Sequence, residues 1–305
     1  MKNEKGLVIW ILSDKRRGHF NQSIALADAL SEFSKTKCHL IEVGGFLNNF
    51  LSLLTRTFSD GNNLPQPHLI IATGHKTHLA ALAAKRRYGG RAIIIMRPSL
   101  PADFFDLVIL PNHDKPLKTK KKIIIEGALS RISPDQESKN AQCIIILGGP
   151  SKHYHFDEHD VFSSIQKIYQ NSDSSKIIIT DSPRTPLRLT RKMMHQFEDI
   201  FISWDNFEEG AIQEEMKKSA EIWVTEDSIS MIYDALSTGS SVGIIPASRK
   251  GENRLSRTVD SIIERKFATS FQQWSTDGVL NPSPMLCEAK RCASFVMKTF
   301  FFKQF

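Results

Sequence analysis

Short runs of Ile, Val and Leu alternate along the chain with longer segments in which apolar residues recur at helical spacing. Most of these runs have no polar alternation, which indicates strands covered on both faces, and strands that alternate with helices are typical of parallel sheets. Each half of the chain is therefore expected to form its own doubly wound sheet. The pattern predicts strands at 7–12, 39–43, 69–73, 92–96, 107–110 and 123–125, then at 143–147, 177–180, 200–203, 222–225 and 242–245.

A polar segment at 130–140 separates the two sets of strands; it contains Pro134 and has no apolar periodicity. We expect a Rossmann-like N-terminal domain over residues 1–135 and a Rossmann-like C-terminal domain over residues 141–305. A C-terminal helix could pack back on the first domain. The length of 305 residues agrees with two domains. The predicted fold class is α/β, with two Rossmann-like domains that face a cleft, as in GT-B glycosyltransferases.

Composition places the chain among ordinary globular proteins, with 41% hydrophobic and 24% charged residues. No apolar run approaches the roughly 18 residues that a membrane-spanning helix needs. The apolar start at 7–12 leads directly into charged residues instead of a signal-peptide cleavage site. The four cysteines include no CxxC pair. We therefore expect a reducing, cytoplasmic location.

The net charge of +7 is unevenly distributed. Residues 1–140 contain 21 Lys and Arg against 12 Asp and Glu, whereas residues 141–305 contain 19 against 21, so the net charges are +9 and −2. A basic half favours an anionic partner. No zinc-finger, RNP-type or basic-zipper pattern accompanies the charge, so nucleic acid is not expected as a partner.

Basic and apolar residues of the first half also predict peripheral attachment to the inner face of an anionic membrane. The alternative is a solvated face whose charges keep the protein dispersed. The prediction depends on an apolar helix at 46–58 with Arg56, on a basic run at 118–122, and on Lys85, Arg86, Arg87 and Arg91 around Tyr88.

Polar residues that follow the first predicted strand are candidates for catalysis, because open parallel sheets bind ligands at the carboxyl ends of their strands. Asp14 and His19 lie in this loop, next to the start of a helix. Imidazole titrates near neutral pH, so His19 is the candidate general base, and Asp14 is the next candidate. Helix capping by His19 and Asn21 is the alternative interpretation.

Two loops of the second half carry candidate groups for a diphosphate. Gly148 and Gly149 follow a strand, where glycine lets backbone amides approach an anion closely. Arg184 lies between Ser182 and Thr185 after the next strand and is the best candidate phosphate ligand. An ordinary helix cap with a solvated arginine is the alternative.

A third polar cluster follows the strand at 222–225. The hydroxyl groups of Ser228 and Ser230 suit a phosphate at a helix start. The carboxylates of Glu226 and Asp227 suit the hydroxyl groups of a sugar or ribose, although two adjacent acids would repel phosphate unless they are aimed elsewhere. Simple capping by Thr225 or Asp227 is again the alternative.

Four motifs occur in order between residues 7 and 246, and together they resemble the elongated-mitochondria fission family. Bacterial members of this family are regarded as glycosyltransferases of surface-polysaccharide or lipooligosaccharide assembly. In this chain Lys15-Arg16-Arg17 stands where a Gly-Lys-Pro type turn is usual. The motifs are Ser13-Asp14 with Gly18-His19-x-Asn21-Gln22-Ser23, Phe105-Asp106-Leu107-Val108 with Pro111-x-His113-Asp114, Thr180-x-Ser182-x-Arg184-Thr185-Pro186, and Thr225-Glu226-Asp227-Ser228-x-Ser230-Met231.

The resemblance, which extends to MurG-like transferases, implies transfer of a sugar from a nucleotide-diphosphate sugar to a lipid-linked or lipooligosaccharide acceptor. It implies that His19 serves the acceptor side and Glu226 the donor side, without a cofactor or metal. Further residues implied on the acceptor side are Gly18, Asn21, Gln22, His113 and Asp114.

Two other classes of function remain open. A sugar-nucleotide epimerase also uses paired Rossmann domains, and a non-catalytic protein associated with membranes or division would keep the fold. Three histidines have a spacing that could suit a zinc ion: His153, His155 and His159. We expect them to lie in a solvated loop instead.

Overall fold

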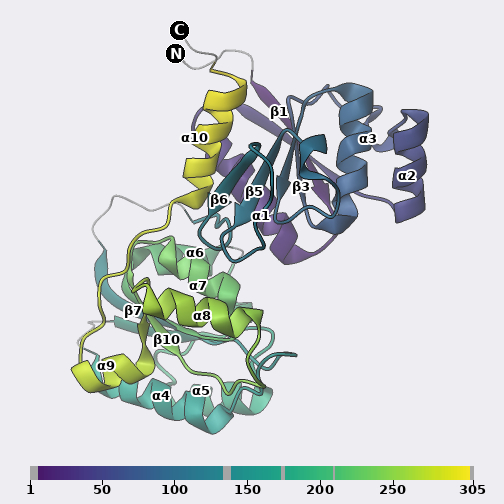
Figure 1. The fold of residues 1–305 in the computed structure, drawn as a ribbon. Coiled ribbons are helices and arrows are strands. Elements are labelled where there is room, and N and C mark those ends of the chain that lie inside the picture. The colour runs from purple at the N-terminus through teal and green to yellow at the C-terminus, as the bar shows by residue number, and fades with distance from the viewer. Residues whose placement is uncertain (1–5, 133–138, 173–175, 209, 303–305) are drawn as a thin grey trace. The chain divides into compact units, whose positions relative to one another are not determined.

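The computed structural model describes residues 6–132, 139–172, 176–208 and 210–302 (Figure 1). The chain divides into unit 1, which comprises Met1–Arg131 with Cys287–Phe305, and unit 2, which comprises Ile132–Leu286. The division after Arg131 falls within the polar segment expected to be a linker, of which residues 133–138, including Pro134, lie outside the described residues. The C-terminal segment, which we assigned to the second domain with a helix that could pack back on the first, belongs to unit 1.

Unit 1 contains a six-stranded sheet in which all neighbouring strands are parallel, in the order β2-β1-β3-β4-β5-β6. All six strands predicted for this half are present, with small shifts at their ends. They are β1 (Leu7–Ser13), β2 (Thr36–Glu42), β3 (Leu69–Thr73), β4 (Arg91–Ile95), β5 (Leu107–Pro111) and β6 (Lys122–Ile125).

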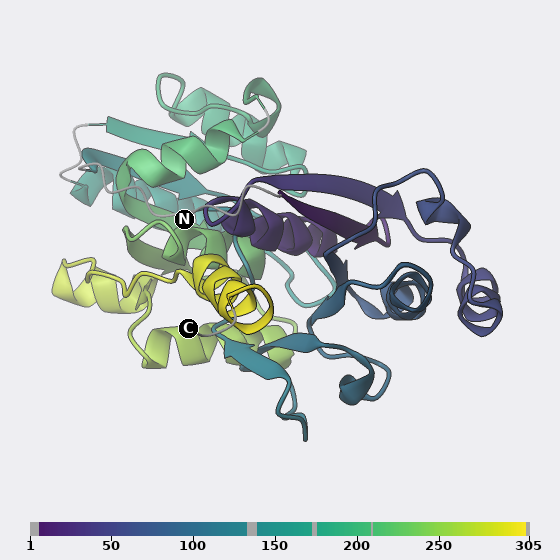
Figure 2. The same ribbon diagram turned by 90° about the horizontal axis from the view of Figure 1, so that it is seen from above.

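Helices cover both faces of this sheet (Figures 1 and 2). Ile9 and Ile11 of β1 pack in one core with α1 and α10, while Trp10 and Leu12 pack in a second core with α3. Burial on both faces explains why the strand is a continuous apolar run. The helices are α1 (Arg17–Ser31), α2 (Phe46–Thr55), α3 (His78–Tyr88) and α10 (Glu288–Phe300).

Unit 2 contains a five-stranded sheet, again with parallel neighbours, in the order β11-β10-β9-β7-β8. Helices α4, α5 and α9 lie on one face and α6, α7 and α8 on the other (Figure 1). The strands are β7 (Asn140–Ile146), β8 (Lys176–Thr180), β9 (Ser219–Thr225), β10 (Ser241–Ile245) and β11 (Thr269–Ser270). The helices are α4 (Glu158–Asn171), α5 (Leu187–Gln196), α6 (Ala211–Lys218), α7 (Ile229–Leu236), α8 (Arg254–Glu264) and α9 (Phe271–Asp277).

One predicted strand, at 200–203, is wrong. Phe201 forms a single bridge to Ile179 of β8, and the chain then turns away from the sheet. The backbone N–H of Trp204 and the hydroxyl of Ser203 donate hydrogen bonds to the buried carboxylate of Asp181. These bonds direct the chain into a short 3-10 helix instead of a further strand.

In both sheets the strand order reverses beside the first strand of the unit. β1 lies between β2 and β3, and β7 lies between β8 and β9. Open parallel sheets bind ligands at the carboxyl ends of the strands on either side of such a reversal. The topology therefore predicts that ligands bind to the residues that follow β1 and β3 in unit 1, and β7 and β9 in unit 2.

Candidate functional site

In unit 2 the segment after β7 bonds directly to the end of β9. The backbone N–H of Gly148 donates to Thr225 Oγ1 at 2.8 Å, and the N–H of Gly149 donates to Asp227 Oδ2 at 3.0 Å. A Cβ added at Gly148 would overlap the Asp227 carboxylate, and one added at Gly149 would overlap the carbonyl of Arg184. Both positions therefore require glycine so that the loops can approach one another.

Arg184 bridges the same loops. Its guanidinium lies 2.8 Å from Asp227 Oδ2 and donates to the carbonyl oxygen of Gly149 at 3.0 Å. The Asp227 side chain is fully buried, and its second oxygen, Oδ1, has no hydrogen-bond partner among the described residues. The charge of Arg184 is thus balanced by a buried carboxylate, while its side chain stays 41% exposed to solvent.

Ser182 and Thr185 hold in place the loop that follows β8 and contains Arg184. The Thr185 hydroxyl donates to the carbonyl oxygen of Gly148 at 2.6 Å and accepts the backbone N–H of Ser182 at 3.0 Å. The two hydroxyl oxygens lie 3.2 Å apart. Both side chains therefore already hold the loop in place in this structure.

Helix α7 begins at this edge without a side-chain cap. Its N-cap residue, Ser228, makes no capping hydrogen bond. The other capping candidates, Thr225 and Asp227, instead bond to the loop of Gly148 and Gly149, which we call the glycine loop. The first amides of a helix have no partner within the helix and favour negative charge. Capping, the alternative interpretation of this cluster, is therefore not what the structure shows. Ser230 lies exposed in the first turn.

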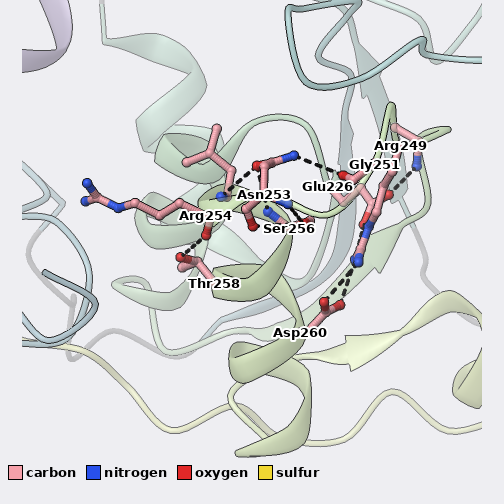
Figure 3. A network of polar contacts seen from close by, with 10 residues as sticks. Glu226, Arg249, Gly251, Asn253, Arg254, Ser256, Thr258 and Asp260 are labelled. Atoms are coloured by element: carbon pink, nitrogen blue, oxygen red, sulfur yellow. Dashed lines mark hydrogen bonds and ion pairs between the residues drawn. The ribbon is translucent and has the colours of Figure 1, made fainter.

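Glu226 is held by an arginine that the sequence analysis missed (Figure 3). Its Oε2 accepts hydrogen bonds from Arg249 Nε at 3.1 Å and a terminal nitrogen at 2.8 Å, and its Oε1 accepts the N–H of Ala247 at 3.1 Å. Arg249 also forms two hydrogen bonds to Asp260 of α8. Hydrogen bonds to Asp260 first, and to Glu226 next, raise the pKa of Arg249 above its usual value despite partial burial.

The two adjacent acids are therefore paired with different arginines, Asp227 with Arg184 and Glu226 with Arg249. This pairing explains how the carboxylates of two adjacent acids occur at one edge, although Arg249 is also shared with Asp260. Tyr154 lies close by, with a buried hydroxyl that has no partner in the described part of the chain. Burial, and then the charge of Glu226, raise the pKa of Tyr154 to about 12.

In unit 1 the loop after β1 brings Asp14 and His19 together. Asp14 Oδ2 lies 2.9 Å from His19 Nδ1, and the Asp14 side chain is fully buried. An ionised carboxylate only accepts hydrogen bonds, so Nδ1 must donate. In the neutral imidazole this leaves the Nε2 lone pair available to accept a proton. Asp14 is thus placed to orient His19, which remains the candidate base.

Gly74, which follows β3, makes room for this pair. A Cβ at Gly74 would overlap the His19 imidazole, and the backbone has a φ of +89°. Gly74 was not among the predicted site residues, although its position after a buried strand next to β1 was an available signal. Lys15 also has a positive φ, 66°, the conformation that favours glycine. In the family that the chain resembles, this turn usually has the sequence Gly-Lys-Pro, with its glycine at the position of Lys15.

The other acceptor-side candidates are divided between two places. Gly18, Asn21 and Gln22 lie in the first turns of α1, which has no side-chain cap, so His19 and Asn21 do not act as caps. His113 and Asp114 follow β5, which lies three strand positions from β1. Neighbouring strands of a sheet lie about 4.8 Å apart, so the ends of β1 and β5 are about 14 Å apart.

Neither a membrane-spanning helix nor a metal-binding cluster of side chains occurs within the described ranges. None of the helices there is long and apolar enough to span a bilayer. Those ranges also contain no group of three or more His, Cys, Asp or Glu that could hold a metal ion. The candidate histidines His155 and His159 are exposed.

The family described as Mitochondrial fission ELM1 matches residues 17–300 of the chain. The chain belongs to this family. The family resemblance drawn from four sequence motifs is therefore confirmed. One relative, the uncharacterized protein RP120 of Rickettsia prowazekii (strain Madrid E), is 25% identical over an alignment that covers 94% of this chain and 97% of the relative.

Solved structures share the fold of this ELM1-family chain at low sequence identity. A UDP-N-acetylglucosamine 2-epimerase has a TM-score of 0.56 and 13% identity, with 100% of this chain and 98% of that chain covered. MurG from Acinetobacter baumannii has a TM-score of 0.54 and 8% identity, with 97% and 100% covered. These similarities confirm the predicted fold class, α/β with two Rossmann-like domains of the GT-B type.

Proposed function

We propose that this ELM1-family protein is a glycosyltransferase and that unit 2 binds its donor, a nucleotide-diphosphate sugar. The observation that carries the proposal is the contact of the Gly148-Gly149 loop with Asp227 and Arg184, at the reversal of strand order in unit 2. The epimerase that shares the fold acts, by its name, on a nucleotide sugar, which supports this class of ligand.

The diphosphate is proposed to bind at the start of α7, where free amides, Ser228 and Ser230 offer hydrogen-bond donors. The exposed side of the Arg184 guanidinium adds a charged donor. Glu226 keeps an unused lone pair on Oε1, because Oε2 accepts two hydrogen bonds from Arg249 and Oε1 accepts one from Ala247. It is proposed to accept a hydrogen bond from a sugar or ribose hydroxyl.

The proposed transfer needs a base, and His19 in unit 1 supplies it. An acceptor hydroxyl attacks the anomeric carbon and gives its proton to His19 Nε2, while Asp14 stabilises the imidazolium that forms. The bond from the anomeric carbon to the diphosphate oxygen breaks, and the electron pair leaves with the nucleoside diphosphate. Arg184 and the amides of α7 then stabilise this leaving group. No step in this scheme uses a metal ion or a cofactor.

The acceptor is proposed to be lipid-linked or a lipooligosaccharide, presented at the cytoplasmic face of an anionic membrane. The net charge of +9 over residues 1–140 supports this location. The protein is accordingly proposed to be cytoplasmic and peripheral to the membrane.

A thermal-shift panel of nucleoside diphosphates and nucleotide sugars tests the donor assignment. A ligand that binds only the folded state must raise the melting temperature, so we expect at least one nucleotide of the panel to do so. If none does, the protein is a non-catalytic member of the fold and the proposal is wrong. The nucleotide sugar that gives the shift is then incubated without an acceptor and followed by NMR. Formation of an epimer of the donor sugar would replace the transferase assignment with the epimerase one.

A further inference from the structure

Helix α2 (Phe46–Thr55) turns its apolar side toward solvent. Large side chains of this helix are among the most exposed hydrophobic residues of the described chain. Asn49, a polar residue, is instead buried, and its side-chain nitrogen donates to the carbonyl oxygen of Gly44 at 2.9 Å. The amphipathic pattern of α2 is thus inverted. The exposed fractions are 72% for Phe46, 71% for Leu47, 42% for Phe50, 56% for Leu51 and 58% for Leu54.

These five side chains form one continuous surface, which we call the α2 face. At 3.6 residues per turn they occupy an arc of about 140°. Leu53 lies at the edge of this arc, about 20° beyond Phe46, and packs against a core of unit 1, and the buried Asn49 lies further round the helix. The rings of Phe46 and Phe50 stack with centroids 6.3 Å apart. Figures 1 and 2 show α2 on the outer side of α3, away from the sheet of unit 1. An apolar surface of this kind marks an interaction site.

Arginines border the α2 face. Arg56 follows α2 in a left-handed conformation, and Arg86 and Arg87 lie exposed on the neighbouring α3. Within residues 6–132 none of the three forms an ion pair with a carboxylate. Arg86 donates to the carbonyl oxygen of Leu53 at 3.3 Å, which ties the positive charge of α3 to α2. Their charges are therefore available to an anionic partner.

The basic cluster expected from the sequence is smaller than predicted. Lys85 and Arg91 both pair with Asp106, at 2.7 and 3.3 Å. Burial of Asp106 opposes ionisation, but the bonds from Lys85, the Ala92 amide and Arg91 outweigh it and lower the pKa of this carboxyl. Of this cluster, Arg86 and Arg87 have no carboxylate partner within residues 6–132, and Arg86 bonds to α2.

We propose that α2 is an in-plane membrane anchor whose apolar face inserts into an anionic bilayer, while Arg56, Arg86 and Arg87 contact the lipid phosphates. A helix of ten residues is about 15 Å long, half the thickness of the hydrocarbon core, so it lies in the interface. A second copy of the chain fits less well, because a symmetric contact would bring the same arginines together. The inference rests on the proposed membrane location of the acceptor, but its test needs no transfer activity.

The test is co-sedimentation of the full chain with vesicles of phosphatidylglycerol and phosphatidylcholine, and with vesicles of phosphatidylcholine alone. We expect binding to the anionic vesicles that weakens with salt. The double variant Phe46→Ser/Leu47→Ser is expected to lower the partition coefficient at least tenfold, because it removes apolar area from the inserted face. The matched control is Leu40→Ser/Phe104→Ser, which changes a Leu and a Phe of unit 1 that are 54% and 55% exposed and lie outside α2, and it is expected to bind like the wild type.

Thermal unfolding and sedimentation velocity complete the test. The substituted side chains are exposed, so both double variants are expected to melt within a few degrees of the wild type. Equal binding by the wild type and by Phe46→Ser/Leu47→Ser, or no binding by the wild type, would overturn the proposal. A wild-type dimer that this variant converts to monomer would assign the α2 face to a second copy instead. Nucleotide binding in unit 2 is measured separately, so its failure is distinguishable from failure of the anchor.

Discussion

A guanidinium nitrogen of Arg184 lies 2.8 Å from Asp227 Oδ2, the same oxygen that accepts the backbone N–H of Gly149 at 3.0 Å. One carboxylate therefore joins the loops that follow β7, β8 and β9. Any change at Arg184 acts both on a ligand and on the folded state. Experiments on this residue must measure stability and nucleotide affinity together.

Arg184→Ala is expected to weaken binding of a nucleoside diphosphate by about 1.5 to 3 kcal/mol, the usual worth of a charged hydrogen bond. It should also lower the free energy of unfolding by about 1 to 3 kcal/mol, because it leaves the buried Asp227 carboxylate without its positively charged partner. Calorimetry and urea denaturation measure the two effects. Asp227→Asn is the control: it removes the anion that competes for Arg184, so affinity should be kept or increased. Unchanged affinity of Arg184→Ala would remove this residue from the site.

His19→Ala is expected to lower turnover by about 10² to 10⁴-fold, the usual effect of losing a general base, with donor affinity unchanged. Asp14→Asn should also reduce turnover, because Asp14 orients the imidazole. The assay follows release of nucleoside diphosphate at saturating substrates. Full activity of His19→Ala would show that the base lies elsewhere, with Asp14 or Asp114 as the next candidate.

Gly74→Ala is expected to displace the His19 imidazole and to strain a backbone with a φ of +89°. Turnover should therefore fall as it does for His19→Ala, with a lower melting temperature. Gly45→Ala is the matched control, because a Cβ at Gly45 meets no atom within 4 Å and its φ is −63°. Similar turnover by the Gly74 variant and the wild type would contradict the proposed role of the Asp14–His19 pair.

Arg249→Met is expected to weaken nucleotide-sugar binding by about tenfold, or about 1.4 kcal/mol, because Glu226 loses the group that positions it. Asp260→Asn is the comparison, since Asp260 bonds to Arg249 and leaves the Glu226–Arg249 contact in place. Isothermal calorimetry with the nucleotide sugar distinguishes the two variants. Equal affinities for both variants would argue against Glu226 as a donor ligand.

The pH dependence of the free energy of unfolding should show the effect of protonating His78. Burial, and next the charge of His75, lower the pKa of His78 from 6.5 to about 4. The unfolded chain therefore binds the proton more tightly than the folded one, so the contribution of His78 is complete above pH 6.5 and is lost as pH falls toward 4. Its size is at most about 3 kcal/mol.

Urea denaturation between about pH 7 and pH 4.5 measures this loss. His78→Gln has no imidazole to titrate, so its stability should fall less over the same range, and the difference from the wild type isolates His78 from carboxyl groups that titrate there. The amide of Gln can replace the acceptor that Ser99 N–H now finds in His78 Nδ1. Parallel pH curves for the two proteins would rule out His78 as the source.

The strands could be predicted from the sequence because burial on both faces leaves a local signature. β3 has the predicted bounds, and it contributes Ile71 to one core and Ile70 to the other. The segment at 200–203 has the same apolar signature but forms a single bridge, from Phe201 to Ile179 of β8. Its path is decided by Asp181, which lies about 20 residues earlier in the chain. Such a long-range hydrogen bond leaves no local pattern.

The candidate site was predicted in part for the same reason. The glycine loop and the acids after β9 follow strands, so their positions at the sheet edge could be inferred. Their partners could not, because pairing depends on distances across loops. Nothing near Arg249 in the sequence links it to Glu226, which lies 23 positions away. The position of Arg249 after β10 was the available signal.

The return of α10 (Glu288–Phe300) to unit 1 has a consequence for synthesis of the chain. Unit 2 is continuous in sequence and can fold as soon as Leu286 has left the ribosome. Unit 1 is translated first, but the core that contains Ile9 and Leu26 is completed by Val296 of α10. Its apolar surface therefore stays uncovered while unit 2 is made. A nascent chain of this kind should bind chaperones through its earliest segments and release them last.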